Sequence, residues 1–304
     1  MGVKGKSLKG EIYLFICTIL WGGAIVAQSM GSDLVEAFTF NCLRSLIGSL
    51  VLVPVILYNR HHTGVSAFRG DSLKVLLRGG IICGFLLAVS INLQQLGVGY
   101  VDTTGLTEAE IALQDKADVG KVGFLTAMYL VIVPILEIFM GKKARPKVYI
   151  NVVLAVAGMY LLCIKEGFSI NKGDLYVIAC AFCFALQILC VDHYAPKVDC
   201  VSLACVQFFS CGIFSAIGMV LLETPNMGNI LAAWAPLLYM GVISCGVAYT
   251  FQVVGQKYCP STTASLIMSL ESVFSAVFGF LILGQTMSVR ELCGCAVMLA
   301  AVLL

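Results

Sequence analysis

Apolar stretches recur along the whole chain, each close to the roughly 20 residues that span a bilayer as a helix. The chain is 60% hydrophobic and only 12% charged, and its mean hydropathy is +0.96. A soluble protein of 304 residues needs more polar surface than this. A membrane β-barrel would instead show alternating segments of about 10 residues. The sequence therefore predicts an all-α membrane protein that crosses the bilayer many times.

Hydropathy and helix breakers divide the chain into about ten expected transmembrane helices. The connections between them are mostly short, and no segment suits a soluble domain. The last stretch is short for a span and stops at Leu304 without a polar tail, so we expect the natural chain to continue. The expected helices cover residues 11–30, 37–58, 75–98, 121–140, 148–164, 174–194, 202–222, 234–256, 262–283 and 289–304.

Basic residues are distributed unequally between alternate loops, and this bias predicts the orientation of the helices. With the N-terminus in the cytoplasm, thirteen basic residues fall on the cytoplasmic side and five on the outer side. Both termini are therefore expected in the cytoplasm. The cytoplasmic set is Lys4, Lys6, Lys9, Arg60, Arg69, Lys74, Arg78, Lys142, Lys143, Arg145, Lys147, Lys197 and Lys257, and the outer set is Lys116, Lys121, Lys165, Lys172 and Arg290.

The two halves of the chain share residues in the same order. GEIYLFICTILW (10–21) aligns with GDLYVIACAFCF (173–184), and the same offset places Arg44 opposite Gln207. QQLGVGYVDTT (94–104) aligns with QVVGQKYCPST (252–262) through Gln, Gly, Tyr and Thr. Because five helices is an odd number, two such halves enter the membrane from opposite sides, as in many secondary transporters. This arrangement predicts a binding cavity between two inverted five-helix repeats.

Composition argues against several other functions. The net charge of +2, without a basic stripe interleaved with aromatics, gives no reason to expect a nucleic-acid partner. Most of the 14 cysteines lie within apolar spans, and the CxxC of Cys180 and Cys183 has no second ligand pair, so we expect no metal and no cofactor. The sequence contains no phosphate-binding GxxxxGK[ST] and no HExxH, which argues against an ATP-driven pump and a zinc enzyme.

Four stretches in order resemble EamA-type carriers of the drug/metabolite transporter superfamily. They are LWGGAIVAQ (20–28), FNCLRSLIG (40–48), GKVGFLTAMYLVIVP (120–134) and ASLIMSLESVFSAVFGFLILGQ (264–285). The resemblance covers nearly the whole chain and implies a ten-helix fold of two inverted repeats, with alternating access to a cavity lined by spans 1–4 and 6–9. Spans 5 and 10 would be peripheral. On this basis residues 1–10 form a cytoplasmic N-terminus, 11–164 the first repeat and 165–304 the second.

The sequence departs from the family pattern at three places. Ser272 stands where the family has proline, which predicts a straighter ninth helix, and Gln285 replaces an acidic residue. Residues 105–118 form a polar insertion with four acidic side chains on the expected outer side. A solvated loop, a lid, a partner contact and an engineered graft are all open interpretations of this insertion.

Glu271 and Arg44 are charged residues within apolar spans, where a charge costs roughly 2.5–3.5 kcal/mol or more. Glu271 is expected to serve either as a structural carboxylate at a broken helix or as a proton or substrate site. Arg44 is expected to meet Glu271, a helix terminus or a substrate carboxylate, since its fork can bind a carboxylate through two hydrogen bonds.

Further polar and aromatic residues lie at membrane depth on the spans expected to line the cavity. Trp21 and Gln28 are seven residues apart, hence on one helical face. Core packing and hydrogen bonds between helices are the alternative explanation for such residues. The remaining candidates for the substrate cavity are Asn92, Gln95, Thr126, Tyr129, Gln187, Tyr249, Gln252 and Ser269.

These features together predict a secondary transporter of the cell membrane that exports a small polar metabolite, most simply an amino acid. Few charges at depth favour a zwitterion with an apolar or aromatic side chain over a sugar phosphate. The expected partners are this small molecule and the lipid bilayer, and a homodimer is left open. The alternatives are an uncoupled facilitator, a carrier of another metabolite, an intramembrane enzyme or a channel. No catalytic residue is expected.

Overall fold

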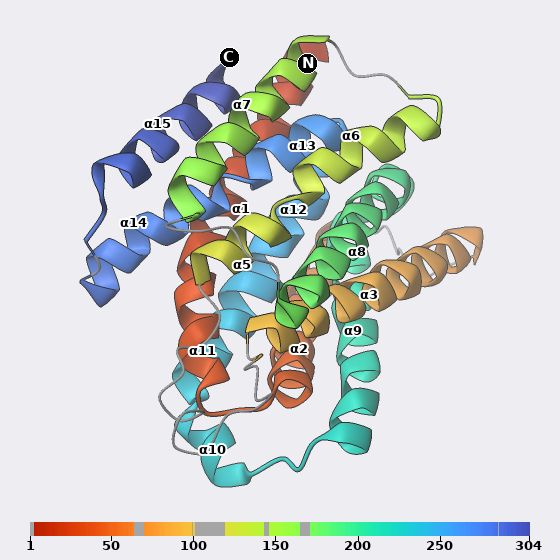
Figure 1. The fold of residues 1–304 in the computed structure, drawn as a ribbon. Helices are drawn as coiled ribbons and strands as arrows, with labels where there is room; N and C mark the ends of the chain where they lie inside the picture. Colours follow the sequence, from red (N-terminus) through yellow and green to blue (C-terminus); the bar gives the residue numbers. More distant parts are fainter. Residues whose placement is uncertain are drawn as a thin grey trace.

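The computed structural model describes residues 3–63, 70–98, 100, 119–142, 146–164, 171–284 and 286–304, and every regular element in these ranges is helical. Figure 1 shows long helices packed side by side, with the two chain termini at the same end of the molecule. We call this end the terminal face. The predicted insertion 105–118 lies outside the described residues.

The first half of the chain contains long helices and one interrupted helix. Because α1 begins at Val3, the predicted N-terminal tail is helical from that residue onward. The fourth apolar stretch is divided into α5 and α6, separated by residues 127–128. The bounds are α1 Val3–Ser32, α2 Ala37–Thr63, α3 Gly70–Val98, α5 Val119–Thr126, α6 Tyr129–Phe139 and α7 Pro146–Cys163.

The second half repeats this pattern with more irregularities. Its third membrane segment combines a short helix, a π-helix and an α-helix, and its fourth is again interrupted, at residues 269–270. The bounds are α8 Lys172–Tyr194, α9 Cys200–Leu222, α10 Met227–Ala232, α11 Trp234–Leu238, η1 Tyr239–Ala248, α12 Tyr249–Gln256, α13 Ser261–Met268, α14 Glu271–Leu283 and α15 Val289–Leu303.

Within the described ranges, nine helical stretches are long and apolar enough to cross a membrane, and they match the first nine expected spans to within a few residues. The tenth expected span corresponds to α15, whose 15 residues are fewer than the roughly 20 that cross the hydrocarbon core. The prediction of an all-α membrane protein is confirmed in this form. The ten-helix inverted repeat stays a prediction.

The expectation of a straighter ninth helix is wrong, because α13 ends at Met268 and α14 begins at Glu271. Two serine hydroxyls bond back to the preceding turn near this break. Ser265 donates to the Thr262 carbonyl at 2.9 Å and Ser269 donates to the Leu266 carbonyl at 2.7 Å. Such bonds to the preceding turn compete with the backbone ladder and bend or break helices.

The helices pack in a few extensive pairs. α2 lies along α9, α3 packs against α8 and α9, and α7 pairs with α15 at one side of the molecule (Figure 1). Gly22 lets α1 approach α14 closely, since a Cβ at this position would stand 2.4 Å from Cβ of Phe274. This close approach brings Trp21 next to the interrupted ninth helix.

Candidate functional site

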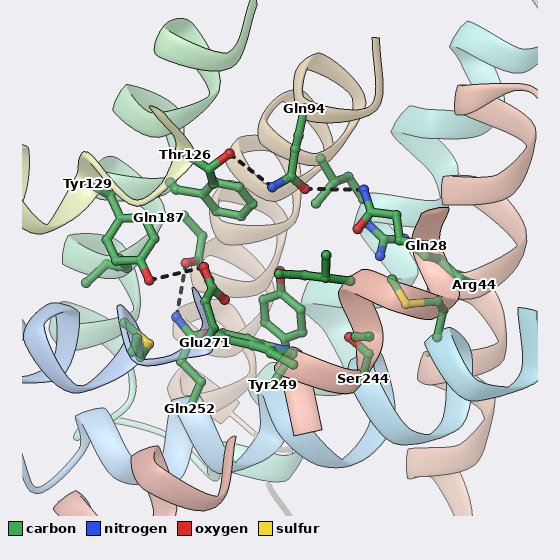
Figure 2. Close-up of a pocket in the computed structure, with 18 residues that line it drawn as sticks. Gln28, Arg44, Gln94, Thr126, Tyr129, Gln187, Ser244, Tyr249, Gln252 and Glu271 are labelled. Atoms are coloured by element: carbon green, nitrogen blue, oxygen red, sulfur yellow. Dashed lines mark hydrogen bonds between the residues drawn. The ribbon is translucent and has the colours of Figure 1, made fainter. Parts of the chain in front are cut away.

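A cavity of about 70 Å³ lies where the two interrupted helices break, and both halves of the chain contribute to it (Figure 2). Its walls come from α1, α2, α3, α5 and α6 of the first half and from α8, η1, α12, α13 and α14 of the second. In the described ranges α7 and α15 contribute no lining residue, as the family resemblance implies for spans 5 and 10. Among the described residues, α9 also contributes no lining residue, although the family resemblance implies that span 7, which corresponds to α9, lines the cavity.

Most of the residues proposed from sequence meet at this cavity. They come from seven different elements, so their proximity depends on the tertiary fold. The residues that line the cavity are Trp21, Gln28, Arg44, Thr126, Tyr129, Gln187, Tyr249, Gln252 and Glu271.

Asn92, Gln95 and Ser269 are buried but do not line this cavity. Asn92 accepts a hydrogen bond from Asn41 at 3.0 Å and donates to the Ser215 hydroxyl at 2.9 Å, which ties α3 to α2 and α9. Gln95 accepts from Gln28 at 2.7 Å. For these residues the structure shows hydrogen bonds between helices, which was the alternative to a place in the cavity wall.

Glu271 is the first residue of α14 and is partly exposed, toward the cavity. Its one hydrogen bond within the described residues comes from the Tyr129 hydroxyl at 3.5 Å, a weak contact at that distance. Tyr129 is itself the first residue of α6, so the two residues that follow the two helix breaks meet across the cavity. The carboxylate is left with most of its hydrogen-bonding capacity unused.

Arg44 lies on α2 and is 3% exposed. Its Nε has no hydrogen-bond partner, and no carboxylate of the described chain forms an ion pair with it. Figure 2 shows Arg44 beside Gln28 at one end of the cavity and Glu271 beside Tyr129 at the other, with Tyr249 between them. The two charged residues of the cavity therefore do not neutralise each other.

Side-chain amides form two chains along the cavity walls. In the first half, Gln28 donates to Gln94 at 3.5 Å, and Gln94 donates to the Thr126 hydroxyl at 3.2 Å. In the second half, Gln252 donates to Gln187 and Gln187 donates to Gln207, both at 3.3 Å. Each chain connects three helices and holds polar groups at fixed positions.

Three cavity-lining side chains carry a buried polar atom without a partner among the described residues. Two are donors, the Trp21 indole Nε1 and Arg44 Nε, and one is an acceptor, Gln252 Oε1. Buried polar atoms in native proteins nearly always have a partner, so such atoms need an explanation. An anionic group is the kind of partner that the two donors lack, and a cationic donor is the kind that the acceptor lacks.

Aromatic rings pack in two pairs at the cavity. Trp21 packs edge-on against Tyr249 with ring centroids 4.6 Å apart, and Phe184 packs edge-on against Tyr129 at 6.5 Å. Trp21 and Phe184 occupy equivalent positions in the aligned stretches 10–21 and 173–184. The structure therefore places one large ring from each half at the cavity.

Sequence reasoning did not select half of the lining residues. Most of these are apolar, and nothing in composition separates them from core residues. Gln94 could have been found as the neighbour of Gln95, but only the rotation of α3 decides which amide reaches the cavity. The unselected lining residues are Ala24, Ile25, Ile91, Gln94, Phe184, Ile188, Met240, Ser244 and Met268.

Toward the terminal face, polar contacts join the helices beyond the cavity. Glu137 of α6 is 6% exposed and accepts a hydrogen bond from Thr262 of α13. Lys142, which follows α6, forms an ion pair with Asp192 of α8 at 2.9 Å. The hydrogen bond to Asp192 raises the pKa of the Lys142 ammonium above its ordinary value. These contacts hold the two interrupted helices and α8 together on this side.

Comparison with known proteins finds similar chains that are named as transporters. The chain is 26% identical over 305 residues to an "Uncharacterized transporter" of Archaeoglobus fulgidus, covering 100% of this chain and 88% of that one. It is 25% identical over 300 residues to the threonine/homoserine exporter RhtA of Escherichia coli K12, covering 95% of this chain and 88% of the exporter.

A solved crystal structure shares the fold, with a TM-score of 0.75 at 17% identity over 96% of this chain and 94% of that one. A model of the EamA-like transporter family matches residues 8–164 and again residues 171–304. The two matches together include both helix breaks and every charged residue of the cavity. The chain is a member of the EamA-like transporter family.

Proposed function

We propose that this protein is a secondary transporter that exports a small zwitterionic amino acid by alternating access. The observation that carries the proposal is the pair of unneutralised charges, Arg44 and Glu271, at opposite ends of one cavity. A buried charge without a partner is costly in the membrane interior. An α-amino acid supplies both missing partners in one molecule.

The geometry suggests which group goes where. The Arg44 guanidinium is a planar fork that matches a carboxylate. At the other end, the Glu271 carboxylate and the unpartnered Gln252 oxygen are acceptors for an ammonium group. A guanidinium at one end and a carboxylate at the other are the two groups that would bind a zwitterion.

The packing supports two inverted repeats as the basis of alternating access. We pair α1 with α8, α2 with α9, α3 with the η1–α12 segment, α5–α6 with α13–α14, and α7 with α15. Under this pairing, the contact of α1 with α14 has its counterpart in the contact of α8 with α5–α6. The contact of α2 with η1 likewise has its counterpart in the contact of α9 with α3. All of these contacts are observed. A cavity between such halves can open to either side by rocking of one half against the other.

The relatives support an amino acid as the cargo. The Escherichia coli K12 exporter named for threonine and homoserine is similar to this chain over nearly its full length, at 25% identity. Both of those molecules are zwitterions with a short hydroxylated side chain. With both termini in the cytoplasm, as the basic residues predict, export across the cell membrane is the direction we propose.

Flux measurements in proteoliposomes test this function. We expect saturable threonine flux, accelerated by unlabelled threonine on the opposite side, because counterflow distinguishes a carrier from a channel. Decarboxylated threonine and 2,3-dihydroxybutyrate lack one of the two charged groups, so neither should compete. Absence of flux for threonine, homoserine, serine and alanine with correctly folded protein would overturn the proposal.

A further inference from the structure

We infer that Phe184 sets the upper size limit of the transported side chain, so that the carrier accepts short side chains and rejects aromatic ones. The inference rests on the proposed function and concerns how the same cavity selects among amino acids. The sequence alone favoured an apolar or aromatic side chain without distinguishing the two.

The size of the cavity is the first argument. A buried water needs roughly 10–15 Å³ of such free volume, so a cavity of about 70 Å³ accommodates about five to seven waters. Bonded atoms lie about 1.5 Å apart, whereas hydrogen-bonded waters lie about 2.8 Å apart, so a somewhat larger number of bonded atoms fits. This is enough for an amino acid as large as threonine, but a ring-bearing side chain exceeds it.

The position of Phe184 is the second argument. Phe184, Gln187 and Ile188 lie on one face of α8, at the spacing of one helical turn, and all three line the cavity. The Phe184 ring also packs against two buried clusters, one that includes Tyr129 and Met268 and another that includes Tyr249. It therefore stands between the cavity and the core and cannot withdraw without disturbing both.

Comparison with the other lining residues singles out Phe184. Met268 is unbranched and can change rotamer to make room. Trp21 carries an unpartnered N–H, so its substitution would alter polar binding as well as volume. Phe184 has no hydrogen-bonding group, and its edge contact with Tyr129 holds the ring in place. A smaller residue here changes the space beside the substrate and leaves the charged groups unchanged.

Substrate competition measures the effect. We expect phenylalanine and leucine to compete poorly with threonine flux in the wild-type protein. In Phe184→Ala they should compete at least about tenfold better relative to threonine, the size of effect that hydrophobic pockets produce. The competition measured for Phe184→Leu should fall between the wild type and Phe184→Ala. This variant tests the size limit if Phe184→Ala does not fold. Phe182→Ala is the matched control, since Phe182 lies on the same helix but is 47% exposed and absent from the cavity.

The outcomes separate the inference from the function on which it rests. Phenylalanine transport by the wild type as good as that of threonine would overturn the size limit alone. So would an unchanged competition ratio in monodisperse Phe184 variants that still carry threonine. A wild-type protein that is folded but carries no amino acid would overturn the proposed function, and the size limit with it.

Discussion

Arg44 and Glu271 are the charged side chains among the described residues that line the cavity, and the proposed function depends on them most directly. Neither forms an ion pair with another side chain of the described ranges. Tyr129 offers Glu271 one weak hydrogen bond, and Arg44 Nε has no partner among the described residues. Their charges are therefore free to interact with a substrate rather than with each other.

Neutralising Glu271 should weaken substrate binding. We expect Glu271→Gln to raise the KM for threonine by roughly thirtyfold or more, because truncating one partner of a buried charge pair costs about 2 kcal/mol or more. Flux measured against threonine concentration checks this. Glu137→Gln is the comparison, since Glu137 is a buried carboxylate outside the cavity and its loss should leave KM unchanged. Equal KM values for wild type and Glu271→Gln would contradict the assignment.

The same measurement applies to Arg44 with a different pair of variants. Arg44→Gln removes the charge, and we expect a loss of threonine affinity comparable to that of Glu271→Gln. Arg44→Lys retains the charge but loses the planar fork, so its KM for threonine should fall between those of the wild type and Arg44→Gln. If Arg44→Lys and Arg44→Gln are equally impaired, the fork contributes and the charge does not. Normal affinity in both variants would exclude Arg44 from the binding site.

At the scale of elements, the helix breaks and helix ends determine where polar groups can stand. Both breaks place their next residue, Tyr129 or Glu271, at the cavity. On the side opposite the terminal face, Glu223 at the end of α9 accepts hydrogen bonds from Phe38 and Thr39 at the start of α2. This carboxylate satisfies backbone donors that a helix N-terminus leaves free, and it lies where the helix dipole favours negative charge.

Removing this cap should destabilise the protein measurably. The Glu223 carboxylate accepts three bonds, from two backbone N–H groups at 2.7 Å and the Thr39 hydroxyl at 2.8 Å. We expect Glu223→Ala to cost about 1–3 kcal/mol, because it leaves those donors unsatisfied. Thermal unfolding in detergent measures the loss as a lower Tm. Glu223→Gln keeps one acceptor and should lose less, and a Tm unchanged in Glu223→Ala would show that the cap contributes nothing.

At the scale of the whole molecule, the basic residues predict how the helical bundle is oriented in the membrane. The terminal face carries both chain ends in Figure 1, and the basic residues predict that this face is cytoplasmic. The polar contacts of Glu137 with Thr262 and of Lys142 with Asp192 lie on the same side of the cavity.

Protease protection tests the orientation. We expect epitope tags at either terminus to resist protease added to intact cells and to be cleaved after lysis. A tag inserted at Asn226, between α9 and α10, should be cleaved in intact cells, because this connection lies on the opposite side of the predicted membrane. Cleavage of a terminal tag in intact cells would reverse the predicted orientation.

The sequence by itself determined the membrane helices and most of the candidate residues. Bilayer thickness sets the length of an apolar span, so the first nine spans could be located from hydropathy alone. Arg44 and Glu271 could also be identified from the sequence, because a charge within an apolar span is costly in the bilayer. These features depend on the chain and its solvent, and need no knowledge of how the helices pack.

Only the tertiary structure decided which of these residues meet. Asn92 and Trp21 looked alike as polar groups at depth, yet Asn92 bonds to Asn41 and Ser215 while Trp21 lines the cavity. The break at 127–128 and the separation of Arg44 from Glu271 were equally hidden, whereas a broken ninth helix was one interpretation of Glu271 from the sequence. Each depends on the rotation of a helix about its own axis against several neighbours. That rotation is set by the packing of many side chains at once, which no single stretch of sequence records.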